Sequence, residues 1–323
     1  MPKEIDILEL SESIKNGERV ALGKAITLVE STRPQDQSLS SQLVTECLKH
    51  SKASKRIGIT GVPGVGKSTF LEAIGMHLCE KGEKVAVLAI DPSSEITGGS
   101  ILGDKTRMEQ LSQHENAFIR PSPSRGNLGG VGRKTLETII LCEAAGFTNI
   151  FIETVGVGQS ETAVHHLADM FVLLVLASAG DELQGIKRGI MEMADLVVIN
   201  KSDGAQLDLT AHAKAAYHSA LHLFPAKDSE WTVGVQDVSS IEGRGIDETW
   251  NRIDSFFNHV MVNGYLGHHR KTQNLFWMNK AVEDNLVNRF YSDSKIQSKR
   301  EELERQVLSG ELSPFEASQK LLE

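Results

Sequence analysis

The residues with the clearest chemistry form one short segment near the start of the chain, Gly61-Val62-Pro63-Gly64-Val65-Gly66-Lys67-Ser68. Its glycines allow successive backbone N–H groups to turn toward phosphate oxygens, and a helix starting directly after it adds a positive N-terminus. Lys67 can reach the outer phosphates, and the Ser68 hydroxyl can hold Mg²⁺. The strand-like run Ile57–Ile59 before the segment favours a P-loop over an ordinary glycine-rich turn. The candidate binding residues here are Gly61, Val62, Gly64, Val65, Gly66, Lys67, Ser68 and Thr69.

Two aspartates downstream could supply metal ligands. Asp91 comes directly after the apolar run Val85–Ile90, and Asp104 follows a glycine-rich stretch. Carboxylates are ligands that Mg²⁺ prefers, although an Asp before a proline is also a common turn residue. Arg107, three residues after Asp104, could neutralise charge on a triphosphate.

A third acidic residue, Glu153, ends the apolar run Ile150–Ile152, and Gly156 follows three positions later. This spacing matches the Walker B and switch II pattern, in which the carboxylate orders a metal-bound water and the glycine N–H contacts the terminal phosphate. Glu153 is therefore a further candidate for a metal site beside the P-loop.

The segment Asn200-Lys201-Ser202-Asp203 follows the apolar run Leu196–Ile199 and matches the pattern N-K-x-D. Its Asp can accept hydrogen bonds from both N1–H and N2–H of guanine, whereas adenine lacks this pair of donors and would leave the carboxylate unpaired. Asn200 would brace the loop, and the lysine stem could cover the base. Ser239-Ser240-Ile241 follows the last predicted strand, where a backbone N–H usually contacts guanine O6. Although the tetrapeptide alone could be a surface turn, this combination favours GTP and GDP over adenine nucleotides.

A further charged, glycine-rich loop spans residues 179–189. Gln184 could position a water molecule, and Lys187 could supply positive charge to a transition state. A solvated loop before a helix is the ordinary interpretation. With the residues above, the candidate catalytic set is Lys67, Arg107, Gln184 and Lys187.

The elements that would position these residues alternate between apolar runs and amphipathic segments, from Lys55 to about Ser240. Short, nearly continuous apolar runs are typical of parallel strands that are covered on both faces. This pattern predicts an α/β fold, a doubly wound and mostly parallel sheet with its ligand crevice at the carboxyl ends of the strands. The predicted strands are Ile57–Ile59, Val85–Ile90, Ile150–Ile152, Phe171–Leu176, Leu196–Ile199 and, more weakly, Thr232–Val238.

Helical patterns flank this core on both sides. Residues 5–50 show apolar positions at helical spacing, and Pro34 separates two helices. The chain is again helical after about residue 244, and Ser313 is the expected N-cap of a last helix from Pro314 to Leu322. We expect an N-terminal helical segment at 1–50, a P-loop domain at 51–243 and a C-terminal helical extension at 244–323.

Composition excludes several classes of protein. The 323 residues carry a formal charge of −9, which argues against binding nucleic acid through bulk charge. The three cysteines are widely spaced, so they predict neither a disulfide framework nor a zinc knuckle. The sequence has no long apolar run, and its first residues are acidic. We expect a cytoplasmic protein without membrane contact.

The whole set of motifs resembles the MeaB/ArgK-type P-loop GTPases, a metallochaperone class associated with adenosylcobalamin-dependent methylmalonyl-CoA mutase. The resemblance covers nearly the whole chain. It rests on Gly61–Ser68, Asp91–Ser94, Leu102–Arg107, Ser124–Gly130, Glu153–Gln159 and Asn200–Asp203.

This resemblance implies a homodimer formed through the C-terminal helices and Mg²⁺ held around Ser68, Asp91, Asp104 and Glu153. Because no residue of the sequence is an evident arginine finger, we expect GTP hydrolysis to be slow without a partner. The resemblance also implies a third switch at Gly180–Gly189 that communicates with the mutase, which makes Asp181, Gln184 and Lys187 candidate coupling residues. The family's role is to gate the loading of adenosylcobalamin and to protect or reactivate the mutase, with methylmalonyl-CoA mutase the expected partner.

Two other classes remain as alternatives. A GTPase metallochaperone of the nickel type would need a cluster of metal ligands, and the sequence offers only the pairs His165-His166 and His268-His269. A transport-linked ATPase or kinase is disfavoured by Asn200–Asp203, and no feature offers a phosphoacceptor site.

Overall fold

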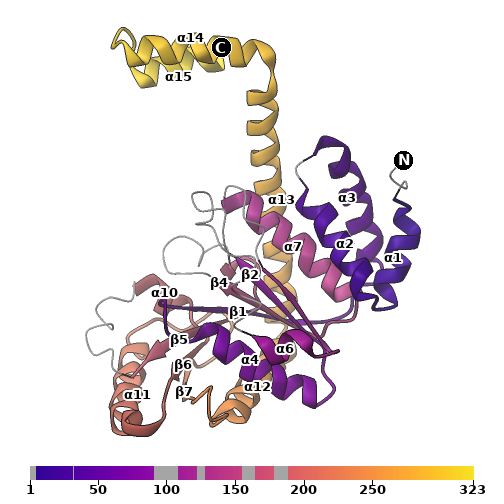
Figure 1. Ribbon diagram of the computed structural model, residues 1–323. Coiled ribbons are helices and arrows are strands. Elements are labelled where there is room, and N and C mark those ends of the chain that lie inside the picture. Colours follow the sequence, from indigo (N-terminus) through magenta and orange to yellow (C-terminus); the bar gives the residue numbers. More distant parts are fainter. Residues whose placement is uncertain (1–4, 32, 91–107, 122–127, 155–163, 178–187) are drawn as a thin grey trace. The chain divides into compact units, whose positions relative to one another are not determined.

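The computed structural model describes residues 5–31, 33–90, 108–121, 128–154, 164–177 and 188–323 (Figure 1). The chain forms two compact units, Met1–Gln273 and Asn274–Glu323. The first unit contains the sheet and the predicted binding motifs, so it is the unit that bears on function.

The described strands form one sheet of seven, and every neighbouring pair is parallel. The order across the sheet is β3-β2-β4-β1-β5-β6-β7, which confirms the predicted α/β fold with a parallel sheet. The strands are β1 (Lys55–Gly61), β2 (Val85–Ile90), β3 (Ala117–Arg120), β4 (Asn149–Thr154), β5 (Met170–Leu176), β6 (Leu196–Asn200) and β7 (Gly234–Asp237).

The extent to which each strand is buried explains whether it could be predicted from the sequence. Every residue of β2, β4 and β6 is buried, and each strand contains a continuous apolar run. Polar residues occur only at the ends of these strands, as Asn149, Glu153 and Thr154 in β4 and Asn200 in β6. The strand β3 was not predicted, because it has only four residues at the sheet edge and alternates buried with half-buried positions. The weak run Thr232–Val238 contains the shorter strand β7.

Helices cover both faces of the sheet (Figure 1). On one face, α4 and α12 pack together and enclose the main hydrophobic core with the sheet. On the other face, α7 packs against β2 and against the three N-terminal helices. The helices of the first unit are α1 (Ile7–Lys15), α2 (Arg19–Glu30), α3 (Pro34–Leu48), α4 (Lys67–Glu80), α6 (Glu109–Gln113), α7 (Leu128–Ala144), α10 (Arg188–Met193), the 3₁₀ turn η1 (Gly204–Gln206), α11 (Leu207–Leu221) and α12 (Ile246–Val262).

The N-terminal segment contains three helices, one more than the two that Pro34 was predicted to separate. Pro34 does begin a helix, as expected, because proline is well accommodated in a first helical turn. The additional break lies between α1 and α2, where Gly17 adopts a left-handed conformation with φ 81°. That glycine lets the chain turn and return along α1.

The C-terminal helices are α13 (Tyr265–Ser292), which begins in the first unit, α14 (Ser294–Leu308) and α15 (Pro314–Leu322). The last helix confirms the predicted bounds, and Ser313 Oγ accepts a hydrogen bond from the Glu316 N–H at 3.1 Å. Leu303 and Ala317 are buried where α14 and α15 pack together. The second unit is therefore built around a pair of helices.

Two of the ion pairs at the amino ends of the strands involve buried carboxylates, and the first joins Arg56 to Glu143. Arg56 Nε donates to the Glu143 carboxylate at 2.8 Å, and the hydroxyls of Ser54 and Ser51 also donate to it. Burial alone would raise the pKa of Glu143, but the guanidinium and the two hydroxyls hold it below the ordinary value. The charged pair therefore stabilises the fold at pH values above the ordinary carboxyl pKa, and this contribution is lost as the pH falls through the lowered pKa.

The second ion pair joins α13 to the start of β5. Arg270 donates to both carboxylate oxygens of Asp169, at 2.8 and 2.7 Å, and to the Ser54 carbonyl at 2.6 Å. The Arg56 backbone N–H also donates to Asp169, at 2.9 Å. The Asp169 side chain is 0% exposed, so its charge depends on these donors. Arg270 thus fastens the first turns of α13 to the base of the sheet.

Replacing Arg270 by Met should lower the free energy of unfolding by about 2–4 kcal/mol, because it leaves a buried carboxylate without its cation. The matched control is Lys271→Met, which removes a neighbouring charge that is exposed on the same helix. Urea denaturation of the full chain measures both variants. Equal stability of the two variants would contradict a structural role for the Arg270–Asp169 pair.

Candidate functional site

The predicted P-loop connects the carboxyl end of β1 to the first turn of α4. Lys67 is the first residue of α4, and its ammonium group donates to the carbonyls of Gly61 at 2.8 Å and Val62 at 3.3 Å. The lysine charge is therefore held over the loop. A helix N-terminus, a ring of backbone amides and this ammonium group together form an anion site suited to phosphate.

Two glycines of the loop are required by its geometry. Gly66 has φ 91°, and a Cβ atom there would lie 2.7 Å from Asn200 Nδ2. Gly61 has φ 155°, and a Cβ atom there would lie 2.5 Å from the Leu174 carbonyl oxygen on β5. Any side chain at either position would displace the loop, which gives a physical reason for glycine in the motif.

Glu153 reaches the loop from the neighbouring strand β4. It lies beside Ile59 of β1 in the register of the sheet, and it is only 4% exposed. The Ser68 hydroxyl donates to its carboxylate at 3.2 Å. The structure thus brings together two of the four predicted metal ligands. Because Mg²⁺ prefers hydroxyl and carboxylate oxygens, this pair fits such an ion.

A hydrogen bond that the sequence analysis missed ties the same strand ends together. Thr154 Oγ1 donates to Thr60 Oγ1 at 3.0 Å, and both residues are 0% exposed. The only sequence signal for this bond is a threonine at or near the end of each of the two apolar runs. This bond fixes β4 against β1 where Glu153 meets the P-loop.

The Asn200–Asp203 segment contacts the P-loop directly. The Asn200 side-chain amide donates to the Val65 carbonyl at 2.9 Å and to the Gly66 carbonyl at 3.4 Å. Lys201 Nζ donates to the Gly64 carbonyl at 2.8 Å, and its backbone adopts φ 57°. Asn200 therefore braces the loop as predicted, and Lys201 contacts it as well.

The loop that follows β7 contacts the Asn200–Asp203 segment. Ser239 Oγ donates to the Asp203 carboxylate at 2.7 Å, and Ser240 Oγ donates to Asn200 Oδ1 at 2.7 Å. The backbone joins the two loops as well, because the Ser202 N–H donates to the Val238 carbonyl at 3.0 Å. Ser239 and Ser240 therefore position the side chains of Asp203 and Asn200.

This role of the serine hydroxyls was not predicted from the sequence, which suggested only a backbone contact to the base. Two serines that follow a strand give no distinctive signal until the fold places β7 beside β6. Ile241, the third residue of that predicted set, is 82% exposed. Asp203 keeps one carboxylate oxygen on Ser239, and its two oxygens together offer more acceptor positions than that bond uses.

The remaining predicted site residues lie outside the described part of the chain. They are Asp91, Asp104, Arg107, Gly156, Gln184 and Lys187. Their assignments stay predictions.

The two histidine pairs are brought together by the fold. The ring centroids of His165 and His269 lie 6.0 Å apart, and those of His165 and His166 lie 5.6 Å apart. Within the described ranges, however, no group of three or more His, Cys, Asp or Glu side chains could hold a metal ion. All three cysteines are buried with free thiols, as their spacing predicted.

A parallel sheet with a P-loop after its central strand and an N-K-x-D segment braced against that loop defines a P-loop GTPase. The sequence model of the family described as "Methylmalonyl Co-A mutase-associated GTPase MeaB" matches residues 22–295. The chain belongs to this family, and it is a GTPase that binds guanine nucleotides.

Relatives along nearly the whole chain agree with this assignment. A probable GTPase of Mycobacterium tuberculosis is 50% identical over 97% of this chain and 94% of its own length. "GTPase ArgK" of Escherichia coli is 46% identical over 100% and 98%. The mouse protein named "Methylmalonic aciduria type A homolog, mitochondrial" is 46% identical over 97% of this chain and 78% of its own length.

A solved structure shares the fold as well. It is described as a "LAO/AO transport system kinase", with a TM-score of 0.76, 39% identity and coverage of 99% of this chain and 98% of that one. None of the helices that the structure describes is long and apolar enough to cross a membrane.

Replacing Asp203 by Asn should weaken GTP binding about 10- to 100-fold, because a carboxamide cannot accept hydrogen bonds from both guanine donors. The same variant should gain affinity for xanthosine triphosphate, whose O2 can accept from the new amide. Isothermal titration with both nucleotides measures the change. Asp208→Asn is the control, since it removes an exposed carboxylate from the adjacent helix α11. Unaltered GTP preference in Asp203→Asn would contradict the base assignment.

Proposed function

We propose that this chain is a chaperone that uses GTP binding and hydrolysis to gate adenosylcobalamin loading onto a cobalamin-dependent acyl-CoA mutase and to protect or reactivate that enzyme. The proposed partner is methylmalonyl-CoA mutase. The observation that carries the proposal is the match to the mutase-associated GTPase family over residues 22–295. The name of the mouse relative, which refers to methylmalonic aciduria, supports the same partner.

The nucleotide would be held at two ends of one site. The P-loop amides and Lys67 would bind the phosphates, and Asp203 would bind the guanine base. Asn200 would join these two ends, because its amide contacts the P-loop carbonyls and the proposed base-binding Asp203 follows it three residues later. The site is therefore a continuous path from base to phosphate.

Mg²⁺ is the proposed cofactor, held by Ser68 and Glu153 together with Asp91 and Asp104. The ion would neutralise charge on the phosphates when bound. Among the described residues, Glu153 is placed to orient the Ser68 hydroxyl, since the two are hydrogen-bonded at 3.2 Å. Burial of Glu153 would keep competing water away from that carboxylate.

Four further residues are proposed to act in hydrolysis or in signalling: Arg107, Gly156, Gln184 and Lys187. Gln184 and Lys187 precede α10, whose residues pack against β5. A change in this segment would therefore be transmitted to a strand of the sheet. Hydrolysis is proposed to be slow until the mutase engages these residues.

The C-terminal helices are proposed to form a homodimer. In the second unit, the part of α13 after Gln273 exposes several large apolar side chains, α14 exposes Leu308, and α15 exposes Phe315 and Leu322. Exposed apolar side chains at this density are typical of surfaces that pair with another chain. They include Val282, Leu286, Val287, Leu308 and Phe315.

Affinity capture should identify the partner. The full chain loaded with a non-hydrolysable GTP analogue should retain a cobalamin-dependent mutase from an extract, and purified mutase should raise its GTPase rate. Lys67→Ala is the control bait, because loss of the P-loop cation should abolish tight triphosphate binding. A GTPase rate that is already fast and that the mutase leaves unchanged would contradict the proposal, as would capture of a nickel enzyme instead.

The magnesium assignment has its own test. Glu153→Gln should raise the Mg²⁺ concentration needed for half-maximal GTPase activity by about tenfold, since a neutral amide replaces a charged oxygen ligand. Glu115→Gln, which changes an exposed glutamate, serves as the matched control. If both variants need the same Mg²⁺ concentration as the natural chain, Glu153 does not support the metal.

A further inference from the structure

The backbones of β1 and β4 stop pairing with each other just before the P-loop. The last pair in their ladder is Ile59 with Glu153. Past this pair, β1 continues along β5 as far as Gly61, and β4 continues along β2 as far as Thr154. Within the described residues, no backbone ladder therefore holds the ends of these two strands together beyond Glu153.

A pair of hydroxyl groups joins the two strand ends at the next position. Thr154 Oγ1 donates to Thr60 Oγ1 at 3.0 Å, and the Ile59 carbonyl lies 3.4 Å from the same hydroxyl as a second acceptor. Both threonines are 0% exposed, so water cannot replace either partner. This side-chain bond takes the place of the missing backbone pair.

The neighbours of the two threonines carry the chemistry of the site. The residue after Thr60 is the first of the P-loop, and its carbonyl accepts from Lys67 Nζ at 2.8 Å. Thr154 follows Glu153, whose carboxylate accepts from the Ser68 hydroxyl at 3.2 Å. One hydrogen bond therefore links the strand that leads into the P-loop to the strand that carries Glu153.

The two threonines can act on the site only through these neighbours. Successive side chains of a strand point to opposite faces of the sheet. Ile59 belongs to the hydrophobic core beneath α4, the helix from which Ser68 reaches Glu153. Thr60 and Thr154 therefore lie on the other face, where both are fully buried. Neither hydroxyl is placed to touch a bound nucleotide.

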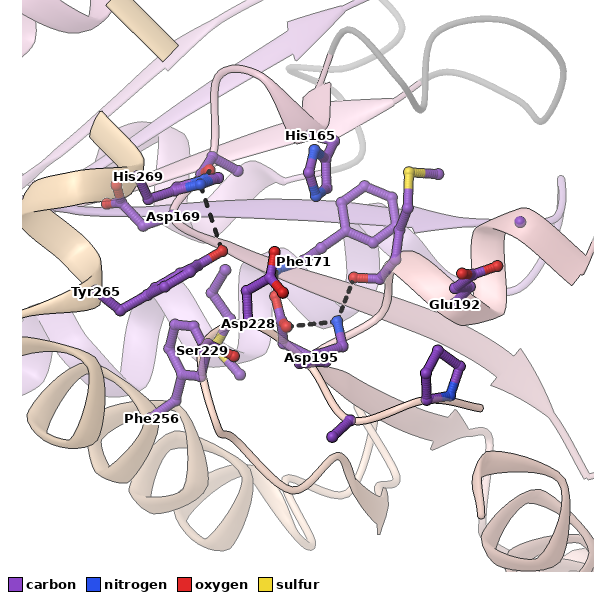
Figure 2. A pocket seen from close by; sticks show the side chains of 17 residues that line it. His165, Asp169, Phe171, Glu192, Asp195, Asp228, Ser229, Phe256, Tyr265 and His269 are labelled. Atoms are coloured by element: carbon purple, nitrogen blue, oxygen red, sulfur yellow. Dashed lines mark hydrogen bonds and ion pairs between the residues drawn. The ribbon is translucent and has the colours of Figure 1, made fainter. Parts of the chain in front are cut away.

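Neutral hydroxyls suit this position better than an ion pair would. At the amino ends of the strands the contacts are charged: Lys227 Nζ donates to Asp195 at 2.7 Å, and Asp195 accepts from the Phe171 N–H at 2.8 Å (Figure 2). A full charge close to the P-loop would attract or repel bound phosphates and metal. The hydroxyl pair fixes the strand ends without adding such a charge.

We propose that Thr154 is a positioning residue for GTP hydrolysis, with Thr60 as its partner. The bond between them holds the Glu153 carboxylate beside the Ser68 hydroxyl, so that oxygens of both side chains can reach one Mg²⁺ ion. This role rests on the proposed function of Glu153 as a metal ligand. Guanine and the phosphates of GDP are held by other loops, so their binding does not depend on the threonine pair.

GTP hydrolysis by the full chain, measured without a mutase over a range of Mg²⁺ concentrations, tests this role. Thr154→Val keeps the branched shape and removes the hydroxyl, so it should raise the Mg²⁺ concentration needed for half-maximal activity about tenfold. The dissociation constant for GDP without Mg²⁺ should change by less than about twofold. Thr138→Val is the matched control, because Thr138 is a buried threonine of α7 whose hydroxyl donates to the Lys134 carbonyl of its own helix.

Thr60→Val and the double variant separate the hydrogen bond from a general loss of stability. If the two hydroxyls act through each other, the single variants and the double variant should need the same Mg²⁺ concentration. Thr154→Ser keeps the hydroxyl and loses a buried methyl group, so it should keep the natural Mg²⁺ requirement even where it lowers stability. Thr154→Ala repeats the comparison with Thr154→Ser should the valine variant fail to fold, and GDP binding shows which variants are folded.

A natural Mg²⁺ requirement in Thr154→Val, an equal effect in Thr138→Val, or additive effects in the double variant would overturn the role of Thr154. Glu153→Gln distinguishes this failure from failure of the metal assignment. If Glu153→Gln raises the Mg²⁺ requirement and Thr154→Val does not, only the positioning role is wrong. If neither variant raises it, the metal assignment and the positioning role are both wrong.

Discussion

The side-chain amide of Asn200 is the contact on which the nucleotide site depends. It holds two carbonyls of the P-loop and accepts a hydrogen bond from Ser240, so three segments that are distant in sequence meet at one group. Gly66 permits this approach, because a side chain there would collide with the same amide. The loop for phosphate and the loop for the base therefore form one rigid unit rather than two independent ones.

The sheet explains why these segments can meet. Strands β1 and β6 flank β5, and β7 lies beside β6, so the loops that follow these strands lie together at the carboxyl ends of the sheet. The threonine pair at the ends of β1 and β4 adds Glu153 to this edge. Because the strands are parallel, residues that are far apart in the sequence become neighbours around one ligand site.

Much of this could be predicted from the sequence, for identifiable reasons. Fully buried parallel strands leave continuous apolar runs, and the motifs at Gly61–Ser68 and Asn200–Asp203 have spacing that few other structures need. Local patterns could not predict β3, because a short edge strand buries only alternate residues. Nor could they predict the contacts of Ser239 and Ser240, because these depend on which strands become neighbours.

The strand β5 has a further consequence for the two edges of the sheet. It has seven residues, so its amino end lies roughly 20 Å from the nucleotide end, at about 3.3 Å per residue. Groups at the amino ends of the strands are therefore far beyond hydrogen-bond reach of a bound nucleotide. The Arg270–Asp169 pair can thus stabilise the sheet without contacting phosphate or base.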